Sequence, residues 1–188
     1  MSSPDQKTIK ADELFLVVDE NDQPLEPLPR KLVHGHGVWH RVAHVWLVNN
    51  KHEVLCQQRS VDKELNPGCW EVFLGGHMSP GESYEAGAMR ELSEEAGIIL
   101  ENSALELYQV YKFTDFSGYN NEFIAIFICQ WNGDISTLQF QDGEVAQTAW
   151  RSISDIREQL KKKADNWTFC GYELDALDYI ETHYDKRV

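Results

Sequence analysis

The residues from Gly76 to Ile98 read GHMSPGESYEAGAMRELSEEAGI, and this stretch decides the fold. Glycine and proline near its start predict a loop, while Ser83 and Gly97 are a good N-cap and a good C′ residue for a helix between them. One face of that helix is apolar at helical spacing and would pack on a sheet: Ala88, Met89, Leu92 and Ala96. A loop followed by a capped amphipathic helix is therefore predicted.

Another face of the predicted helix carries three carboxylates, Glu91, Glu94 and Glu95. At about 100° per residue they lie in one narrow stripe, where like charges repel one another. A divalent cation would relieve the repulsion, because Mg²⁺ in particular bridges protein carboxylates to substrate phosphates. An isolated acidic helix face is more often simply solvated, so the flanking residues have to decide between the two interpretations.

The flanking residues keep a fixed spacing around these carboxylates. Gly76, Glu82 and the run from Arg90 to Ile98 follow the pattern G-x5-E-x7-RELSEEAGI, which resembles the signature of the Nudix hydrolase family at every specified position. The resemblance implies a Nudix-type α/β/α sandwich with a mixed β-sheet. It also implies Mg²⁺-dependent cleavage of a diphosphate linkage in a nucleoside diphosphate derivative or related small molecule, with Mn²⁺ as an alternative ion. Dimers are frequent in this family, so a homodimer is one expectation.

The resemblance also implies roles for individual residues. Four groups would bind the metal ions: the main-chain carbonyl of Gly75 and the side chains of Glu91, Glu94 and Glu95. Glu82 and Arg90 would form an ion pair that holds the loop against the helix. Taken without the resemblance, that pair is a surface salt bridge of little energetic value.

Hydrolysis also requires a general base. Members of the family place this base either in the helix of the signature or in a later loop. Glu94 is the candidate in the helix. Glu144, which ends the sequence Gln141-Asp142-Gly143-Glu144 ahead of a predicted strand, is the candidate in the loop. Both assignments stay open at the level of sequence.

A longer part of the chain, from about Glu13 to Trp150, is similar to isopentenyl diphosphate isomerase and its Nudix hydrolase relatives. The similarity rests on short stretches: Trp39-His40-Arg41, Val45-Trp46-Leu47, Gln58-Arg59-Ser60, Pro67-Gly68-Cys69-Trp70 and Gly76-His77. In the isomerase an arginine and a lysine spaced like Arg59 and Lys63 bind the substrate diphosphate. The resemblance therefore implies that role for these two residues.

The isomerase also binds a second metal ion. Its histidine ligands lie at positions resembling His40 and His77, with another near His34, although the spacing before His40 differs by one residue. Glu122 matches one of two late acidic ligands, and Asn120 stands at the position of the other. Histidines beside tryptophan and glycine also often serve only as hydrogen-bonding residues, so both interpretations of this cluster stay open.

Two further observations separate this chain from the isomerase. The catalytic cysteine of the isomerase falls on Gly75, which has no side chain that could move a proton. The isomerase also has a degenerate Nudix signature, whereas every hydrolase carboxylate is present here. Hydrolysis is therefore the favoured function, and the alternatives are the isomerase reaction and a non-catalytic ligand-binding module.

Periodicity and turn residues predict the remaining elements. Strands are expected at residues 13–19, 42–48, 53–58, 70–74, 105–113, 122–131 and 147–150. Two more helices are expected, one from Ser154 as N-cap to about residue 163 and one over about 172–184. The proline-spaced PLEPLP of residues 24–29 is expected to be an irregular connector. Strands that alternate with helices imply a mixed sheet covered by helices.

The composition is that of one globular domain covering residues 1–188, with residues 1–11 as a loose polar lead. A net charge of −14 at pH 7 argues against a surface that coats nucleic acid. The apolar runs are too short to span a membrane. The N-terminus lacks the apolar region of a signal peptide and the four cysteines include no C-x-x-C pair, which favours a cytoplasmic protein with reduced thiols.

Overall fold

The structure, a computed structural model, describes residues 13–63, 65–101, 104–115, 117–140 and 143–184. The expected N-terminal lead, residues 1–11, lies outside this part. The elements follow one another in the order β1 (Leu14–Phe15), β2 (Leu28–Pro29), α2 (Arg30–His36), β3 (His40–Val48), β4 (Glu53–Arg59), β5 (Trp70–Glu71), α3 (Tyr84–Ala96), β6 (Glu106–Thr114), β7 (Asn121–Gln130), η1 (Ile135–Thr137), β8 (Val145–Ser152), α4 (Ile153–Lys162) and α5 (Glu173–His183).

The main sheet has the strand order β5-β4-β3-β7-β6, and β8 also pairs with β4. The long central strands β3 and β7 run parallel over nine residue pairs, from His40 opposite Glu122 to Val48 opposite Gln130. The other strand pairs are antiparallel, so the sheet is mixed as predicted. This register matters for the site, because it places His40 beside Glu122 at one end of the sheet.

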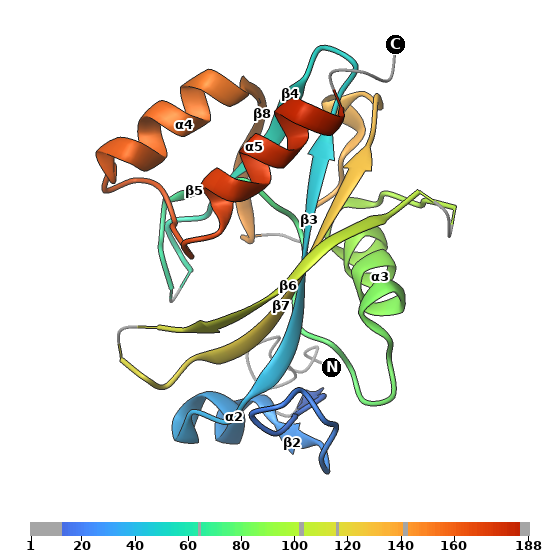
Figure 1. Cartoon of the computed structure of the whole chain (residues 1–188), viewed down its shortest axis with the longest axis vertical. Helices are drawn as coiled ribbons and strands as arrows, with labels where there is room; N and C mark the ends of the chain where they lie inside the picture. Colours follow the sequence, from blue (N-terminus) through green and yellow to red (C-terminus); the bar gives the residue numbers. More distant parts are fainter. Residues whose placement is uncertain (1–12, 64, 102–103, 116, 141–142, 185–188) are drawn as a thin grey trace, which may run out of the picture.

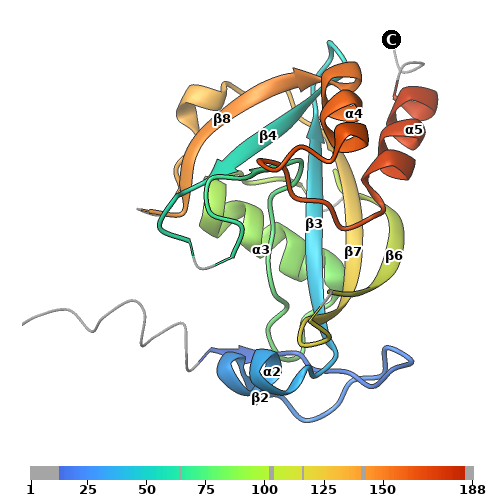
Figure 2. The same cartoon turned by 90° about the vertical axis from the view of Figure 1, so that its left-hand side faces the viewer.

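Helices cover both faces of the sheet (Figures 1 and 2), which confirms the predicted α/β/α sandwich. On one face, Trp46, Ile126 and Leu177 belong to an apolar core shared with α4 and α5. On the other face, Val45, Ala88 and Leu92 belong to a core shared with α3. Successive residues of β3 therefore point to opposite faces, as a strand requires. None of the described helices is long and apolar enough to cross a membrane.

The predicted loop and helix of residues 76–98 are present. The Ser83 hydroxyl accepts a hydrogen bond from the Ala86 amide at 3.2 Å, and Gly97 closes the helix in the left-handed conformation at φ 68°. Of the four predicted core residues, three are fully buried: Ala88, Leu92 and Ala96. Met89 is only half-buried, so the apolar stripe of α3 is narrower than predicted.

The hairpin formed by β3 and β4 opens soon after its turn. β3 and β4 pair at Val48 and Val54, and then β4 moves away to pair with β5 and β8. The chain just before α3 takes the vacated place beside β3, with bridges from Leu74 to Val45 and from His77 to Val42. This split in the sheet brings the start of the Nudix signature against the central strand. It also shortens the strand expected at 70–74 to Trp70–Glu71.

Three other boundaries differ from the prediction. The connector of residues 24–29 ends in β2 and leads into the short helix α2. This helix was not predicted from the sequence, because only Val33 is buried in it and Gly35 interrupts its pattern. Helix α4 is capped by Ser152 rather than Ser154, since the Ser152 hydroxyl accepts from the Asp155 amide at 3.1 Å. The strand expected at 13–19 is regular only at Leu14–Phe15 and continues as isolated bridges.

Candidate active site

A cleft of about 870 Å³ opens where the sheet splits. Its walls include most of the residues singled out in the sequence, which come from separate stretches of the chain. They are Arg59, Lys63, Gly75, Gly76, His77, Arg90, Glu91, Glu94, Glu95, Glu122 and Glu144. Of the other predicted site residues, Glu82 lies behind Arg90, and His40 is fully buried behind His34 and His77.

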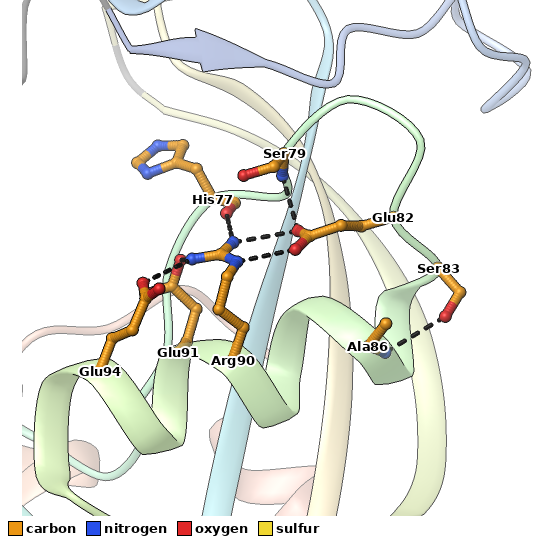
Figure 3. A network of polar contacts seen from close by, with 8 residues as sticks. All are labelled: His77, Ser79, Glu82, Ser83, Ala86, Arg90, Glu91 and Glu94. Atoms are coloured by element: carbon orange, nitrogen blue, oxygen red, sulfur yellow. Dashed lines mark hydrogen bonds and ion pairs between the residues drawn. The ribbon is translucent and has the colours of Figure 1, made fainter.

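Arg90 connects α3 to the loop that precedes it (Figure 3). Its Nε and Nη2 donate to the two carboxylate oxygens of Glu82 at 2.7 and 3.0 Å, and Nη2 also donates to the His77 carbonyl at 2.9 Å. The Ser79 amide donates to Glu82 as well, at 2.8 Å. Partial burial raises the pKa of Glu82, but the hydrogen bonds from Arg90 and Ser79 outweigh it and the net pKa is lowered. This half-buried, two-pronged pair differs from the exposed salt bridges that contribute little.

The same guanidinium contacts two of the three carboxylates that are predicted metal ligands. Nη1 of Arg90 donates to Glu91 at 2.8 Å and to Glu94 at 3.0 Å. The Glu91 carboxylate also lies against Gly76, where an added Cβ would be 2.8 Å from its Oε2. A side chain at position 76 would therefore push Glu91 out of place, which explains why the first residue of the signature is glycine.

The acidic stripe of α3 carries more negative charge than its surroundings compensate. The pKa of Glu95 is raised to about 8, first by burial and then by the nearby charges of Glu91 and Glu144, against the opposing effects of the Gly75 amide and Lys63. Burial also raises the pKa of Glu91, which Arg90 lowers and Glu94 raises. A bound divalent cation is what such a set of crowded carboxylates favours, so these residues fit the metal that the family uses.

Gly75 has a backbone conformation that leaves no room for a side chain. Its φ is 140°, and a Cβ built on it would lie 2.1 Å from the carbonyl oxygen of Ala43. The Val45 and Ala43 amides of the neighbouring strand β3 donate to the carbonyls of Leu74 and Gly76 at 2.7 and 2.9 Å, and no β3 amide donates to the Gly75 carbonyl. The position is therefore closed to a cysteine, and its carbonyl is available as the metal ligand that the sequence predicts.

Arg59 and Lys63 line the cleft, but each already contacts a carboxylate. Arg59 Nη1 lies 3.1 Å from the buried Glu71. Lys63 forms an ion pair with Glu144. The sequence predicted a substrate contact for Lys63 and a catalytic role for Glu144 but not their contact with each other, since 81 residues separate them and nothing in the intervening pattern links them. Glu71 was not predicted as a site residue, because a lone glutamate within a short strand gives no signal of its own.

Three histidines form a compact cluster at the other end of the cleft. His34, His40 and His77 each offer a ring nitrogen, and these atoms all lie within 4.8 Å of one another. Their Nε2 atoms are buried and make no hydrogen bond within the described part of the chain. His34 comes from the helix α2, so the irregular spacing before His40 is explained by an element that the sequence did not reveal.

The surroundings of this cluster suit metal binding. Nδ1 of His40 lies 2.9 Å from the Val38 carbonyl and must be its donor, which leaves an Nε2 lone pair facing the cluster. Burial lowers the pKa of His40 to about 4 and raises that of Glu122 to about 7. Glu122 lies 3.8 Å from His40 Nε2 and accepts from Asn120 at 2.8 Å. Neutral imidazoles beside a carboxylate are ordinary ligands of divalent transition metals.

The chain is similar to proteins of two named activities. Nudix hydrolase 3 from Arabidopsis thaliana is 38% identical over 142 residues, which cover 72% of this chain but 18% of that protein. Isopentenyl-diphosphate Delta-isomerase 1 from Photorhabdus laumondii is 28% identical over 180 residues, which cover 93% of this chain and 98% of the isomerase. An uncharacterized Nudix hydrolase from Pseudomonas aeruginosa is 41% identical over 86 residues, 46% of this chain and 51% of that protein.

Among solved structures, the crystal structure of DR0079 from Deinococcus radiodurans has a TM-score of 0.67 at 20% identity and covers 89% of this chain and 99% of that one. At that identity the likeness concerns the fold alone. The NUDIX domain model matches residues 38–171, which include the central strand, the signature and the strand β8. The family match spans well over half of the sequence, and the chain belongs to the Nudix family.

Proposed function

We propose that this protein is a divalent-metal-dependent hydrolase that cleaves a diphosphate linkage in a nucleoside diphosphate derivative or a related metabolite. The proposal rests on two features that lie side by side. One is the complete set of carboxylates on α3, and the other is Gly75, which has no room for a side chain. The carboxylates suit hydrolysis. The closed position at Gly75 removes a group that carbon-skeleton isomerisation would require.

The metal ligands in this proposal are the Gly75 carbonyl and the side chains of Glu91, Glu94 and Glu95. These residues would hold Mg²⁺ or Mn²⁺, which would supply charge neutralisation of the diphosphate and a lower pKa for an attacking water. Arg90 holds Glu91 and Glu94 in position through the contacts described above. Glu82 in turn fixes Arg90, so the pair supports the ligands rather than touching the substrate.

Charge in the cleft supports a requirement for metal. The described lining contains more acidic than basic side chains: Glu13, Glu71, Glu91, Glu94, Glu95, Asp115, Glu122 and Glu144 against Arg30, Arg59, Lys63 and Arg90. Three of the four cations, Arg59, Lys63 and Arg90, are already paired with carboxylates. A diphosphate without accompanying cations would be repelled from this cleft, because opposing charge is what favours a bound anion.

Two carboxylates remain candidates for the general base. Glu94 is the more exposed, with 56% of its side chain accessible, and hydrogen bonds to Arg90. Glu144 pairs with Lys63 and is close enough to Glu95 to raise its pKa. A diphosphate bound by Arg59 and Lys63 would compete with Glu144 for Lys63. Such an exchange would free the Glu144 carboxylate beside the substrate, which supports Glu144 as the base in the loop.

The isomerase reaction is the second candidate. It is supported by the isomerase from Photorhabdus laumondii, which matches nearly the full length of both chains. It is also supported by the cluster of His34, His40 and His77 beside Glu122, which we assign as a second metal site. We rank it below hydrolysis because Gly75 supplies no acid or base, and because Asn120 offers an amide where the isomerase has a carboxylate.

The experiment that tests the proposal runs both assays on the same preparation. One arm measures Mg²⁺-dependent release of phosphate or nucleoside monophosphate from nucleoside di- and triphosphates, nucleotide sugars and dinucleotides. The other arm measures isomer formation from isopentenyl diphosphate. We expect activity in the first arm and none in the second. Isomer formation without any hydrolysis would overturn the proposal in favour of the second candidate.

A matched pair of variants connects the result to the site. Glu94→Gln removes a proposed ligand or base and should lower the rate at least about tenfold. Glu85→Gln changes an exposed glutamate in the first turn of the same helix, outside the cleft, and should leave the rate unchanged. Equal activity of the two variants would refute the assignment of the site.

A further inference from the structure

His44 is a buried histidine that the functions proposed above do not use. It lies on β3, and the bridges of Val45 to Leu74 and Val42 to His77 place it opposite Gly75. Its side chain is on the same face as that of Trp46, lines the cleft, and is 8% exposed. Directly opposite residues of an antiparallel pair are close neighbours. His44 is therefore adjacent to the residue whose carbonyl is a proposed metal ligand.

Two contacts fix the orientation of the His44 ring. The ring stacks on Phe73, with centroids 3.5 Å apart and planes inclined by 7°. Its Nδ1 lies 2.5 Å from the hydroxyl of Tyr172, the residue just before α5. With one face and one nitrogen engaged, the ring cannot turn without losing both contacts. The other nitrogen, Nε2, makes no hydrogen bond to the described part of the chain.

The surroundings of Tyr172 decide which nitrogen carries the proton. The Tyr172 phenol is buried, and Nδ1 of His44 is the one hydrogen-bond partner of its oxygen among the described residues. If the phenol only accepted from Nδ1, its own buried proton would have no acceptor, so the phenol donates to Nδ1 of His44. Nε2 then carries the hydrogen. Burial lowers the pKa of His44 to about 3, so the ring is neutral.

We infer that His44 is a substrate-binding residue whose Nε2–H donates a hydrogen bond to a phosphate oxygen of the bound diphosphate. A neutral donor suits this place, because Gly75 lies opposite it and a cation bound through the Gly75 carbonyl would repel a positively charged ring. Hydrogen bonds to a charged acceptor are also stronger than neutral ones. The inference rests on the proposed function in that it takes a diphosphate as the ligand, but it concerns binding and not the chemical step.

Two substitutions separate the two ends of the His44 ring. In His44→Asn, the short amide can still accept from Tyr172 but offers nothing at the Nε2 position. In His44→Gln, the longer amide can place an N–H near Nε2 but loses the contact with Tyr172. If the N–H at the Nε2 position binds the diphosphate, His44→Gln should bind a diphosphate better than His44→Asn. If His44 is only a packing residue, the two variants should bind equally well.

The test uses methylenediphosphonate, a diphosphate that cannot be hydrolysed, with Mg²⁺ in titration calorimetry. We expect His44→Asn to raise its Kd about tenfold or more and His44→Gln to recover part of that loss. Nitrogen-15 NMR of labelled histidines should show His44 as the Nε2–H tautomer. Its Nε2 signal should shift when methylenediphosphonate and Mg²⁺ are added. Thermal unfolding shows whether each variant is folded. If His44→Asn does not fold, Tyr172→Phe provides a second way to disturb the tautomer.

The outcomes distinguish this inference from the proposed function. An unchanged Kd in His44→Asn, an Nδ1–H tautomer, or no binding of methylenediphosphonate by the wild type would overturn the role of His44. Binding that depends on His44 in a protein that hydrolyses nothing in the screen would instead leave the role of His44 in place and count against the hydrolase proposal.

Discussion

Replacing Gly75 with alanine should destabilise the protein far more than replacing a glycine at an open turn. At φ 140° the backbone is in a region that residues with a Cβ avoid, which costs about 1–3 kcal/mol. The added Cβ would also lie 2.1 Å from the Ala43 oxygen, and relieving such overpacking costs about another 1–3 kcal/mol. Together these effects predict a loss of about 2–6 kcal/mol in the free energy of unfolding.

Gly81→Ala is the matched control, because Gly81 belongs to the same loop and also has a positive φ, 82°, but would meet nothing within 4 Å. Its cost should be limited to the left-handed conformation, about 1–2 kcal/mol. Urea unfolding of both variants, followed by tryptophan fluorescence, gives the two values directly. If Gly75→Ala proved no less stable than Gly81→Ala, a side chain would fit at position 75. The geometric argument against isomerase chemistry would then be wrong.

Three further predictions concern the loop, the acidic stripe and the histidine cluster. Arg90→Met should lower the free energy of unfolding by about 2–4 kcal/mol in urea titrations, because it leaves the half-buried Glu82 without its charged partner; a loss under 0.5 kcal/mol would make the pair a mere surface salt bridge. The pKa of Glu95 is raised from 4.5 to about 8, so between these pH values the metal-free folded protein holds a proton that the unfolded chain releases. The melting temperature measured in EDTA should therefore fall as the pH rises from 4.5 to about 8. Glu95→Gln should make the melting temperature less dependent on pH over this range. His77→Ala should weaken Mn²⁺ binding at least about tenfold in titration calorimetry, with Glu94→Gln leaving that site intact, and equal Mn²⁺ affinity in His77→Ala and wild type would contradict the cluster as a metal site.

The sequence predicted the parts of the fold that depend on local pattern. The caps at Ser83 and Gly97, the apolar run along β3 and the spacing of the signature can each be recognised in neighbouring residues, and the corresponding elements are present. The helix α2 left little trace, because its seven residues bury one side chain and include Gly35. Short elements held by tertiary contacts rather than by their own pattern are hard to recognise in a single sequence.

The arrangement within the site depended on distant pairings that no local pattern encodes. Lys63 and Glu144 were assigned separate roles, and the fold joins them in one ion pair. The paired state of Arg59 with Glu71 has the same origin, since the partners meet through the pairing of β4 with β5. His44 gave no signal either, because a histidine on a core strand is indistinguishable by sequence from a packing residue until Gly75 and Tyr172 are placed around it.

The source of the oxygen in the product tests the central claim most directly. A hydrolase must place an oxygen atom from water on one of the phosphates that it releases, whereas an isomerase consumes no water. With Mg²⁺ and oxygen-18 water, mass spectrometry of the products should show one labelled oxygen per cleavage in wild type, and little product in Glu94→Gln. Conversion of isopentenyl diphosphate to its isomer, with no labelled phosphate from any diphosphate substrate, would contradict the assignment of this Nudix protein as a hydrolase.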